Sequence, residues 1–330
     1  MKKSFLAAAA LTVAVASSAR AQTACPGGLP SASTAAENSK QQAADLFQYV
    51  APQLSQAVAG GSATLGQNST LGGLGHFSIG VHGTAVAGSV PDVSKFPTCY
   101  TGRYSASLPT SKSAVPMAGA DAAIGIYGGL PLALTNVGGI DLLVSAQYVP
   151  ERTFSGVRVT TPDGSLQVGY GARIGLLSES FIVPGVSLSY IKRDLPRVSI
   201  AANTGNDTLS VTGLKLKTSS WRLSASKSLI LFNVAAGVGQ DKLESAVDSV
   251  TARVAYPSTV TPTRGTIRDL SQNLTRTNYF VNASFSLLVA KITAEVGQST
   301  GGTVSTFNTF QGSQPDGART YGSVGVRFGL

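Results

Sequence analysis

The feature that most constrains this fold is an alternation of apolar and small polar side chains with a period of two residues. The clearest run occupies 320–330, at the end of the chain. Side chains of a β-strand point alternately to opposite faces, so this run predicts a strand with one apolar and one polar face. The apolar face consists of Val324, Val326, Phe328 and Leu330.

The same alternation recurs upstream in runs of about ten residues, the length that crosses a bilayer at a tilt. The expected strands are 75–88, 118–129, 139–150, 164–177, 181–200, 207–227, 229–245, 270–288, 290–300 and 317–330. Within 207–227 the apolar parity changes, which requires a bulge or a turn near Thr218-Ser219. This change and a weak alternation near Val250 leave twelve strands as the alternative to about ten.

Composition indicates that these strands lie in a membrane. Charged residues are 12% of the chain, against about 25% in a typical soluble protein. Beyond the first 21 residues there is no apolar run of the length that a membrane-spanning helix needs. The second face of the strands is mostly Gly, Ser, Thr and Asn, which suits a wet or plugged lumen rather than a soluble sandwich. Short and long connections also alternate. The sequence therefore predicts an all-β, antiparallel transmembrane β-barrel.

The ending 320–330 resembles the assembly signal of bacterial outer-membrane β-barrels. That family usually ends in Phe or Trp, whereas this chain ends in Leu330 with Phe328 two residues before it. The resemblance implies an outer-membrane location, contact with outer-membrane lipid and lipopolysaccharide, and recognition of 320–330 by the barrel-assembly machinery.

Residues 1–21 have the pattern of a secretory signal peptide. Lys2 and Lys3 precede an apolar stretch, and the A-x-A sequence ending at Ala21 predicts cleavage after that residue. Without Lys2, Lys3 and Arg20, 22 basic and 16 acidic residues remain, a net charge of +6. Because an exported protein does not meet nucleic acid, we expect this charge to face lipopolysaccharide phosphates or an anionic solute.

The segment 22–74 breaks the strand pattern, and the barrel is expected over 75–330. A stripe of Leu46, Phe47, Val50, Leu54 and Val58 at three-to-four spacing predicts a helix over 35–59. Pro52 should kink or split this helix, and Gly60-Gly61 should end it. Two interpretations remain: a periplasmic helix lying against the barrel mouth, or a plug inside the lumen.

The two cysteines, Cys25 and Cys99, are expected to form a disulfide, because export places them in an oxidising compartment. Cys99 falls in the first long connection. If that connection lies outside the cell, the bond would bring Cys25 to the outer side and favour a helix threaded through the lumen.

Catalytic and metal-binding motifs are not found: the chain has no Walker loop, CxxC, HExxH or GxSxG sequence. We therefore expect no metal, no cofactor and no enzyme activity. His76-Phe77-Ser78 resembles the His and Ser of the outer-membrane phospholipase A family. That family holds the pair on the lipid-facing surface, which Phe77 and Ile79 occupy here.

Charged residues with inward parity are the candidate lumen site, and cations outnumber anions among them. These residues are Arg173, Arg193, Lys215, Lys217, Arg222, Lys291, Arg327, Asp141 and Glu295. A cationic pore would favour anionic solutes. Alternatively, the cations pair with Asp141, Glu295, Asp45 or Glu37 and hold the plug in place.

Three functions follow as hypotheses. The first is a porin-like channel or small-solute transporter narrowed by the N-terminal helix; the long-chain fatty-acid transporter family resembles it in architecture only. The second is a closed structural or adhesive barrel that binds partners through its long loops. The third is an outer-membrane lipid hydrolase, for which His76 and Ser78 are the candidate residues.

Overall fold

The computed structural model describes residues 31–61, 69–92, 105–132, 134–154, 157–204, 207–254, 263–312 and 314–329. The expected signal peptide and both cysteines, Cys25 and Cys99, lie outside these ranges. The cleavage after Ala21 and the disulfide therefore stay predictions.

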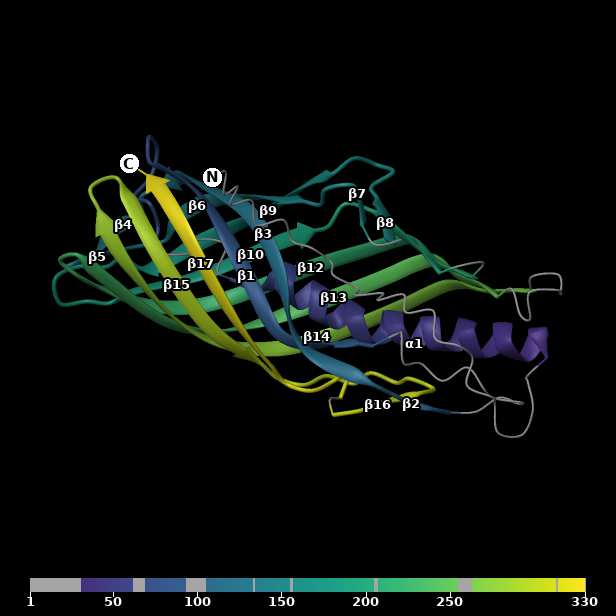
Figure 1. Ribbon diagram of the computed structural model, residues 1–330. Coiled ribbons are helices and arrows are strands. Elements are labelled where there is room, and N and C mark those ends of the chain that lie inside the picture. The colour runs from purple at the N-terminus through teal and green to yellow at the C-terminus, as the bar shows by residue number, and fades with distance from the viewer. Residues whose placement is uncertain are drawn as a thin grey trace, which may run out of the picture.

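An antiparallel sheet closes on itself to form a barrel (Figure 1). The last strand pairs with the first, with Val81 opposite Val326, and the ring is completed where Tyr190 lies opposite Trp221. This closed sheet confirms the predicted β-barrel. In the described part of the chain, the ring runs in order through β1 (Phe77–Pro91), β3 (Thr110–Tyr127), β6 (Gly139–Tyr148), β9 (Leu166–Leu177), β10 (Gly185–Asp194), β12 (Asp207–Leu229), β13 (Phe232–Val254), β14 (Thr263–Leu287), β15 (Ala290–Ser299) and β17 (Arg319–Gly329).

Shorter strands lie at the two ends of the barrel. An extension of the sheet continues from β12 through β11 and β8 to β7, and two small sheets pair β2 with β16 and β4 with β5. Their bounds are β2 (Ser107–Leu108), β4 (Leu130–Leu132), β5 (Thr135–Val137), β7 (Arg152–Phe154), β8 (Val157–Thr160), β11 (Val198–Thr204) and β16 (Thr309–Phe310).

The two ends differ in the length of their connections. Short turns such as 229–232 and 287–290 lie at the end where the chain finishes, on the left of Figure 1. Long connections such as 300–318 lie at the other end, beside β2, β16, β7 and β8. We call these the short-turn end and the long-loop end. The alternation agrees with the expected topology of such a barrel.

Several expected strand boundaries are wrong, among them 118–129, since β3 begins at Thr110. The run 181–200 is divided between β10 and β11, because Pro196 lies between them and a proline has no N–H to give to a sheet ladder. β13 and β14 extend beyond the expected 229–245 and 270–288 at the long-loop end, where they pair with each other as far as Val254. These two strands contact the helix that is described below.

The outer surface carries an apolar belt. Along β6 buried and exposed residues alternate, and the exposed ones are apolar. Aromatic side chains with outward parity, among them Tyr148, Tyr190, Trp221 and Tyr279, are also exposed, as expected of an interfacial girdle. Other exposed members of the belt are Phe77, Ile79, Val81, Leu142, Val144, Val168, Tyr170, Val281, Ile292, Val324 and Phe328.

One helix, α1 (Ala32–Ala59), lies inside the ring, close to the expected range 35–59. It contacts β1 and β3 on one side of the barrel and β12, β13 and β14 on the other. Its first residue is at the long-loop end and its last is within the lumen (Figure 1). Among the described residues, no helix has the length and apolarity required to cross a bilayer.

Candidate functional site

The interior of the barrel is the candidate site, and α1 is its largest component. The helix begins after Ser31, whose side chain accepts from the backbone N–H of Thr34 (3.2 Å). Pro52 lies inside α1 without splitting it. A proline leaves the carbonyl four residues earlier, that of Gln48, without its helical donor. Nε2 of Gln272 on β14 donates to this carbonyl (3.3 Å), so the barrel wall replaces the missing bond.

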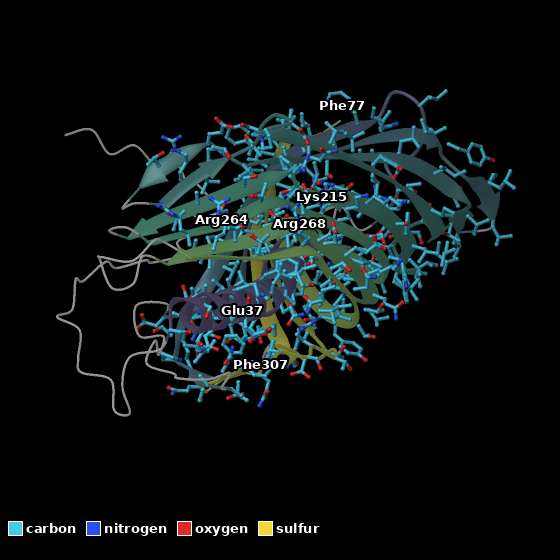
Figure 2. All side chains as sticks on the ribbon, turned by 90° about the vertical axis from the view of Figure 1, so that its right-hand side faces the viewer. Glu37, Phe77, Lys215, Arg264, Arg268 and Phe307 are labelled. Atoms are coloured by element: carbon cyan, nitrogen blue, oxygen red, sulfur yellow. The ribbon has the colours of Figure 1, made fainter. Side chains whose placement is uncertain are left out.

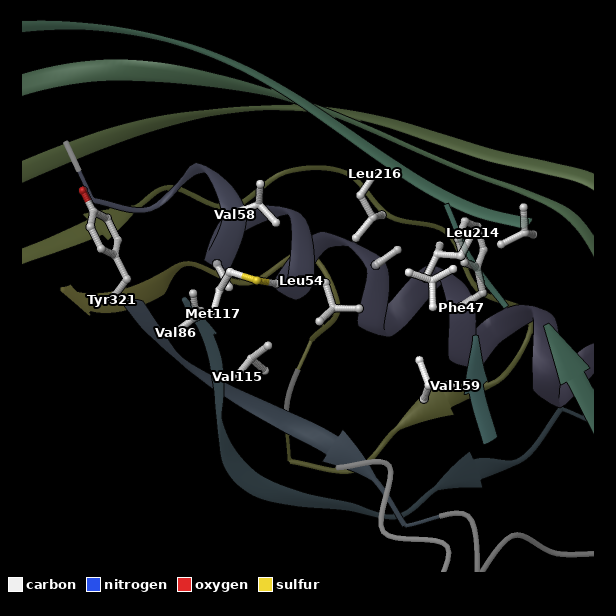
Figure 3. Packing of buried hydrophobic residues seen from close by; sticks show 14 of the residues in the cluster. Phe47, Leu54, Val58, Val86, Val115, Met117, Val159, Leu214, Leu216 and Tyr321 are labelled. Atoms are coloured by element: carbon white, nitrogen blue, oxygen red, sulfur yellow. The ribbon is translucent and has the colours of Figure 1, made fainter. Parts of the chain in front are cut away.

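An apolar stripe of α1 packs against the wall near the long-loop end (Figure 3). Phe47 and Leu54 of the stripe belong to one buried cluster with Leu214 and Leu216 of β12. In this region the wall has its apolar residues inside, the reverse of the membrane belt. Other wall residues in the cluster are Val86, Val115, Met117, Val159, Val247, Val250, Phe280 and Tyr321.

Two arginines of the wall bind the carbonyl end of α1. Nη2 of Arg222 donates to the oxygen of Ala59 (2.9 Å), and Nη1 of Arg193 donates to that of Gly61 (3.1 Å). Arg193 also reaches the oxygens of Ala59 and Gly60 at 3.4 and 3.5 Å. The last carbonyls of a helix lack helical donors and carry partial negative charge, so cationic donors stabilise them. We call this contact the arginine clamp.

Carboxylates of the wall hold the clamp in position. Asp121 of β3 lies 3.2 Å from Nη2 of Arg193, and both residues are buried. Glu295 of β15 lies 3.3 Å from Nη1 of Arg222, and Asp241 of β13 lies 3.9 Å from its Nη2. The clamp therefore connects α1 to strands around the ring. Buried charges arranged in this way are each compensated by an opposite charge.

Asp121 has a second neighbour on the inner wall. Nδ1 of His82 on β1 lies 3.0 Å from its Oδ2. A small pocket borders these two residues and Arg327 of β17, whose Nη1 donates to Oγ of Ser78 (3.0 Å). These groups continue the charged layer toward the short-turn end.

The connection 300–318 is fastened to α1 through a buried carboxylate. Asp45 accepts hydrogen bonds from the backbone N–H groups of Phe307 (3.0 Å) and Asn308 (2.8 Å), and from the Asn308 side chain (2.6 Å). The side-chain oxygen Oδ1 of Asn308 in turn accepts from the backbone N–H of Ala106, just before β2 (2.8 Å). A single helical side chain thus orders two connections.

Tyr49 and Gln53 add a second fastening one turn further along α1. The ring of Tyr49 stacks on Phe310 of β16 with centroids 4.1 Å apart, and its hydroxyl bonds to Ser89. Gln53 pairs with the Ser89 backbone in both directions, at 2.9 and 3.0 Å. This arrangement needs Gly88 beside it, since a Cβ there would collide with the Gln53 side chain.

The chain beyond α1 runs along the wall near the short-turn end. The Thr70 side chain lies close to Gly175 of β9, which has no side chain to exclude it. The backbone N–H of Leu71 donates to the carboxylate of Asp141 (3.2 Å). Asp141 also pairs with Arg173 (2.6 Å), and both are fully buried. These contacts hold the segment 69–71 against the inner wall near the short-turn end.

The structure brings most of the predicted lumen residues to the inner wall. Six of them are buried there: Asp141, Arg173, Arg193, Arg222, Glu295 and Arg327. Lys291 has the same parity as Thr293 and Glu295 and is partly buried near the short-turn end. Paired charges predominate, in agreement with the second of the two interpretations of these residues.

The placement of Lys215 and Lys217 in the lumen is wrong. Both are exposed on the outside of β12, with 48% of the Lys215 side chain accessible (labelled in Figure 2). Leu214 and Leu216 take the inner face instead, because the apolar stripe of α1 needs apolar partners. The alternation of apolar and polar residues in this segment was predicted correctly, but its apolar face packs on α1 rather than on lipid.

The bulge or turn expected near Thr218-Ser219 is also wrong, because no irregularity interrupts the pairing there. Leu214 and Leu216 face inward and Trp221 faces outward with one unbroken parity, so the apolar residues change faces without a bulge. A separate irregularity lies at Gly213, which has φ +67° and where the pairing with β11 shifts. Glycine suits this conformation because a side chain would strain it.

Two interior residues escaped sequence reasoning: Asp121 and Asp241. Asp121 is a single carboxylate in a run of small residues, and that isolation is the signal that could have found it. Asp241 lies among other polar and charged residues, so the sequence offered no such signal. Both carboxylates alter the charge balance. From the arginine clamp to the short-turn end, four buried arginines now face four buried carboxylates, so this part of the wall has no excess of buried arginines, whereas Arg276 and Arg319 are two further buried cations near the long-loop end. The four arginines and four carboxylates are Arg173, Arg193, Arg222, Arg327, Asp121, Asp141, Asp241 and Glu295.

His76 and Ser78, the residues named for lipid hydrolysis, each bond to another residue in the described structure. His76 bonds to the carbonyl of Gly73 (3.4 Å), and Ser78 faces inward and accepts from Arg327. Among the described residues, no group of three or more His, Cys, Asp or Glu side chains is arranged to hold a metal ion.

Neither a family model nor a curated protein matches the chain. Its structure is similar to the outer membrane protease OmpT of Escherichia coli, at 13% identity over 77% of this chain and 96% of that chain, with a TM-score of 0.36. The toluene transporters TbuX of Ralstonia pickettii (11% identity, 83% of this chain, 92% of that chain) and TodX of Pseudomonas putida (10%, 82%, 98%) each have a TM-score of 0.26.

Likenesses this weak assign neither a subfamily nor an activity. The fold is decided by the closed antiparallel ring, with apolar side chains outside and paired charges inside. The chain folds as a closed antiparallel β-barrel with an apolar outer belt. A helix is threaded into its lumen and fastened to the wall near its middle and at its last residues.

Proposed function

We propose that this barrel is a channel for small hydrophilic solutes, closed in the present state by α1. The observation that carries the proposal is the polar inner wall between the arginine clamp and the short-turn end. Below the last residues of α1, the wall is lined by Ser187, Ser224, Ser226, Asn282, Ser284 and Thr293. A small barrel that served only as a scaffold could fill this space with apolar side chains.

Unpaired polar atoms strengthen this point. The side-chain oxygens of Ser226, Ser284 and Thr293 are buried and have no hydrogen-bond partner among the described residues. Buried hydroxyl groups are normally paired with protein or water. An aqueous path would provide the missing partners, whereas a dry core would leave the desolvation cost uncompensated.

The contacts of α1 suit a gate. Its inner end is held by hydrogen bonds to Arg193 and Arg222, and these arginines keep their carboxylate partners if the helix leaves. Its middle turns are fastened through Asp45 and Tyr49 to connections at the long-loop end. Because buried arginines and carboxylates are equal in number from the clamp to the short-turn end, we propose that solutes pass this part of the lumen by size and polarity rather than by the sign of their charge.

Disulfide locks test the gate directly. A Cβ on Gly265 of β14 would lie 3.2 Å from that of Lys40, and one on Gly175 would lie 3.6 Å from that of Thr70. Bonded cysteines have Cβ atoms about 3.5–4.5 Å apart, so Thr70→Cys/Gly175→Cys fits directly and Lys40→Cys/Gly265→Cys should cross-link after a small separation of the two backbones. The first pair pins α1, and the second pins the segment below it.

Conductance in planar bilayers is the measurement, with Cys25 and Cys99 replaced by Ser. We expect the cysteine-free parent to open intermittently, the oxidised locks to stay closed, and reductant to restore opening in the locks alone. Deletion of 32–61 should give a lasting conductance. Silence of both the parent and the deletion variant, each folded as a barrel, would contradict the channel.

A second candidate function is a closed barrel that binds a partner at its long-loop end. The observation in its favour is the amount of ordered structure there: β2 and β16 pair, and the extension from β11 to β7 prolongs the wall. This function requires no conductance from any variant. It also requires that removal of the connection 300–318 abolish binding to the outer-membrane or extracellular partner.

Export and assembly belong to the same proposal. We propose cleavage after Ala21, recognition of 320–330 by the barrel-assembly machinery, and contact of the belt with outer-membrane lipid and lipopolysaccharide. N-terminal sequencing of the protein purified from outer membranes checks the cleavage, and a start at any residue other than Gln22 would correct it.

A further inference from the structure

Two buried arginines near the long-loop end lack the partners that other arginines of the interior have. Arg276 of β14 is 1% exposed and Arg319 of β17 is 8% exposed. Neither forms an ion pair with a carboxylate of the described residues. Arg173, Arg193 and Arg222, by contrast, each lie within 4.0 Å of one.

The hydrogen bonds of this arginine pair use few of its donors. Nη1 of Arg276 donates to the carbonyl of Gly317 (3.0 Å), and Nη2 of Arg319 donates to that of Gln314 (2.9 Å). A guanidinium group has five N–H donors. The Nε atoms of both arginines are buried without a hydrogen-bond partner among the described residues. Several cationic donors are therefore still available at each side chain.

The sheet register brings the two side chains to one place. Ser299 of β15 lies opposite Arg319 on one side and opposite Asn278 on the other. Arg276 is two residues from Asn278 along β14, so its side chain has the same inner face. Below them, the Ser299 hydroxyl accepts from Nε2 of Gln56 on α1 (2.5 Å). The pair thus lies between the wall, the helix and the connection 300–318.

Burial of these two positive charges is energetically unfavourable when no anion is bound. Arg319 is close enough to repel Arg276, and Asp316 attracts it only from beyond ion-pair distance. Two like charges buried together with unused donors carry a desolvation cost that a bound anion offsets.

We propose that Arg276 and Arg319 bind a phosphoryl group at the long-loop end of the lumen. A phosphate dianion matches the two positive charges, and its oxygens can accept from both planar guanidinium groups at once. The bound group would also order the connection 300–318, whose carbonyls at Gln314 and Gly317 already accept from the same arginines. Either a free phosphorylated solute or the phosphorylated headgroup of an outer-membrane glycolipid supplies this chemistry.

Calorimetric titration of the full barrel in detergent micelles tests the site, with inorganic phosphate as the first probe and lipid A as the second. Sodium chloride at the same ionic strength is the blank. We expect saturable binding that weakens about tenfold or more in Arg276→Gln and in Arg319→Gln, because each loses charge-assisted hydrogen bonds. Arg268→Gln is the matched control, since Arg268 lies on the same strand but is exposed (Figure 2).

The two probes distinguish the sources of the phosphoryl group. Binding of inorganic phosphate that depends on both arginines supports a free solute, and arginine-dependent binding of lipid A alone supports a lipid headgroup. Absence of saturable binding of both probes, or binding unchanged in both Gln variants, overturns the site. Arg276→Lys keeps the charge but loses the planar fork, so an intermediate affinity is expected if Arg276→Gln does not fold. Because binding is measured without conductance, this result is independent of the proposed channel.

Discussion

Arg222 on β12 donates a hydrogen bond to the carbonyl oxygen of Ala59, the last residue of α1, at 2.9 Å. The same guanidinium lies 3.3 Å from Glu295 on β15. One side chain therefore links the end of the helix to two strands of the wall. The predictions below test this link, the outer fastening of α1, the corrected register of β12 and the turn that leads into β1.

Arg222→Gln should weaken the clamp. The substitution leaves Glu295 buried without its cation, a change that costs about 3–5 kcal/mol in buried pairs. We expect a lower unfolding temperature for the barrel and longer openings in planar bilayers. Lys217→Gln, an exposed change on the same strand, should leave both measurements near those of the parent. Equal open times in the two variants would mean that the clamp does not hold α1 closed.

Asp45→Asn should loosen the connection 300–318. The carboxylate accepts from two backbone N–H groups and one side-chain amide, and hydrogen bonds to a charged group contribute about 1.5–3 kcal/mol each when made. We expect protease cleavage within 300–318 at lower protease concentrations than in the parent. Glu37→Gln, on the exposed face of the same helix, is the control. Unaltered protection in Asp45→Asn would show that other contacts order the connection.

Cysteine labelling should separate the two faces of β12. With Cys25 and Cys99 replaced by Ser, a membrane-impermeant maleimide should react quickly with Lys217→Cys, which is exposed. It should react at least about tenfold more slowly with Leu216→Cys, which is buried against α1. Reversed rates would restore the register first expected from the sequence.

Gly73→Ala should destabilise the barrel more than Gly75→Ala. Both glycines have φ near the left-handed region, +107° and +90°, so each substitution brings backbone strain of about 1–3 kcal/mol. Only at Gly73 would the new Cβ also meet the backbone of Gly128, 2.9 Å away, whereas Gly75 faces open space. The temperature at which the compact band is lost on an unboiled gel measures both, and equal losses would exclude the steric contribution.

Local pattern was sufficient for the membrane-spanning part of this protein. A strand that crosses lipid must place apolar side chains on every second position, so the exposed faces of β6, β9 and β17 were readable from one segment at a time. The helix could be predicted for the same reason, because its apolar stripe recurs at the three-to-four spacing of an α-helix. Isolated inward charges such as Arg173 and Glu295 were also identified, since lipid does not accept them.

Contacts between residues that are distant in sequence could not be predicted. Asp45 binds a backbone 262 residues further along the chain, and Arg193 reaches back 132 residues to Gly61. Nothing near these residues in sequence specifies such contacts, and the pairing of Arg193 with Asp121 depends on which strands become neighbours in the ring.

The sequence alone determined that this chain forms strands sized for a bilayer, with a separate amphipathic helix before them. Only the tertiary structure decided which side of each strand is inside at the long-loop end. An apolar face can be buried by lipid or by protein, and periodicity does not distinguish the two. Leu214 and Leu216 face inward because α1 occupies the lumen and packs against them, and Lys215 and Lys217 therefore face outward.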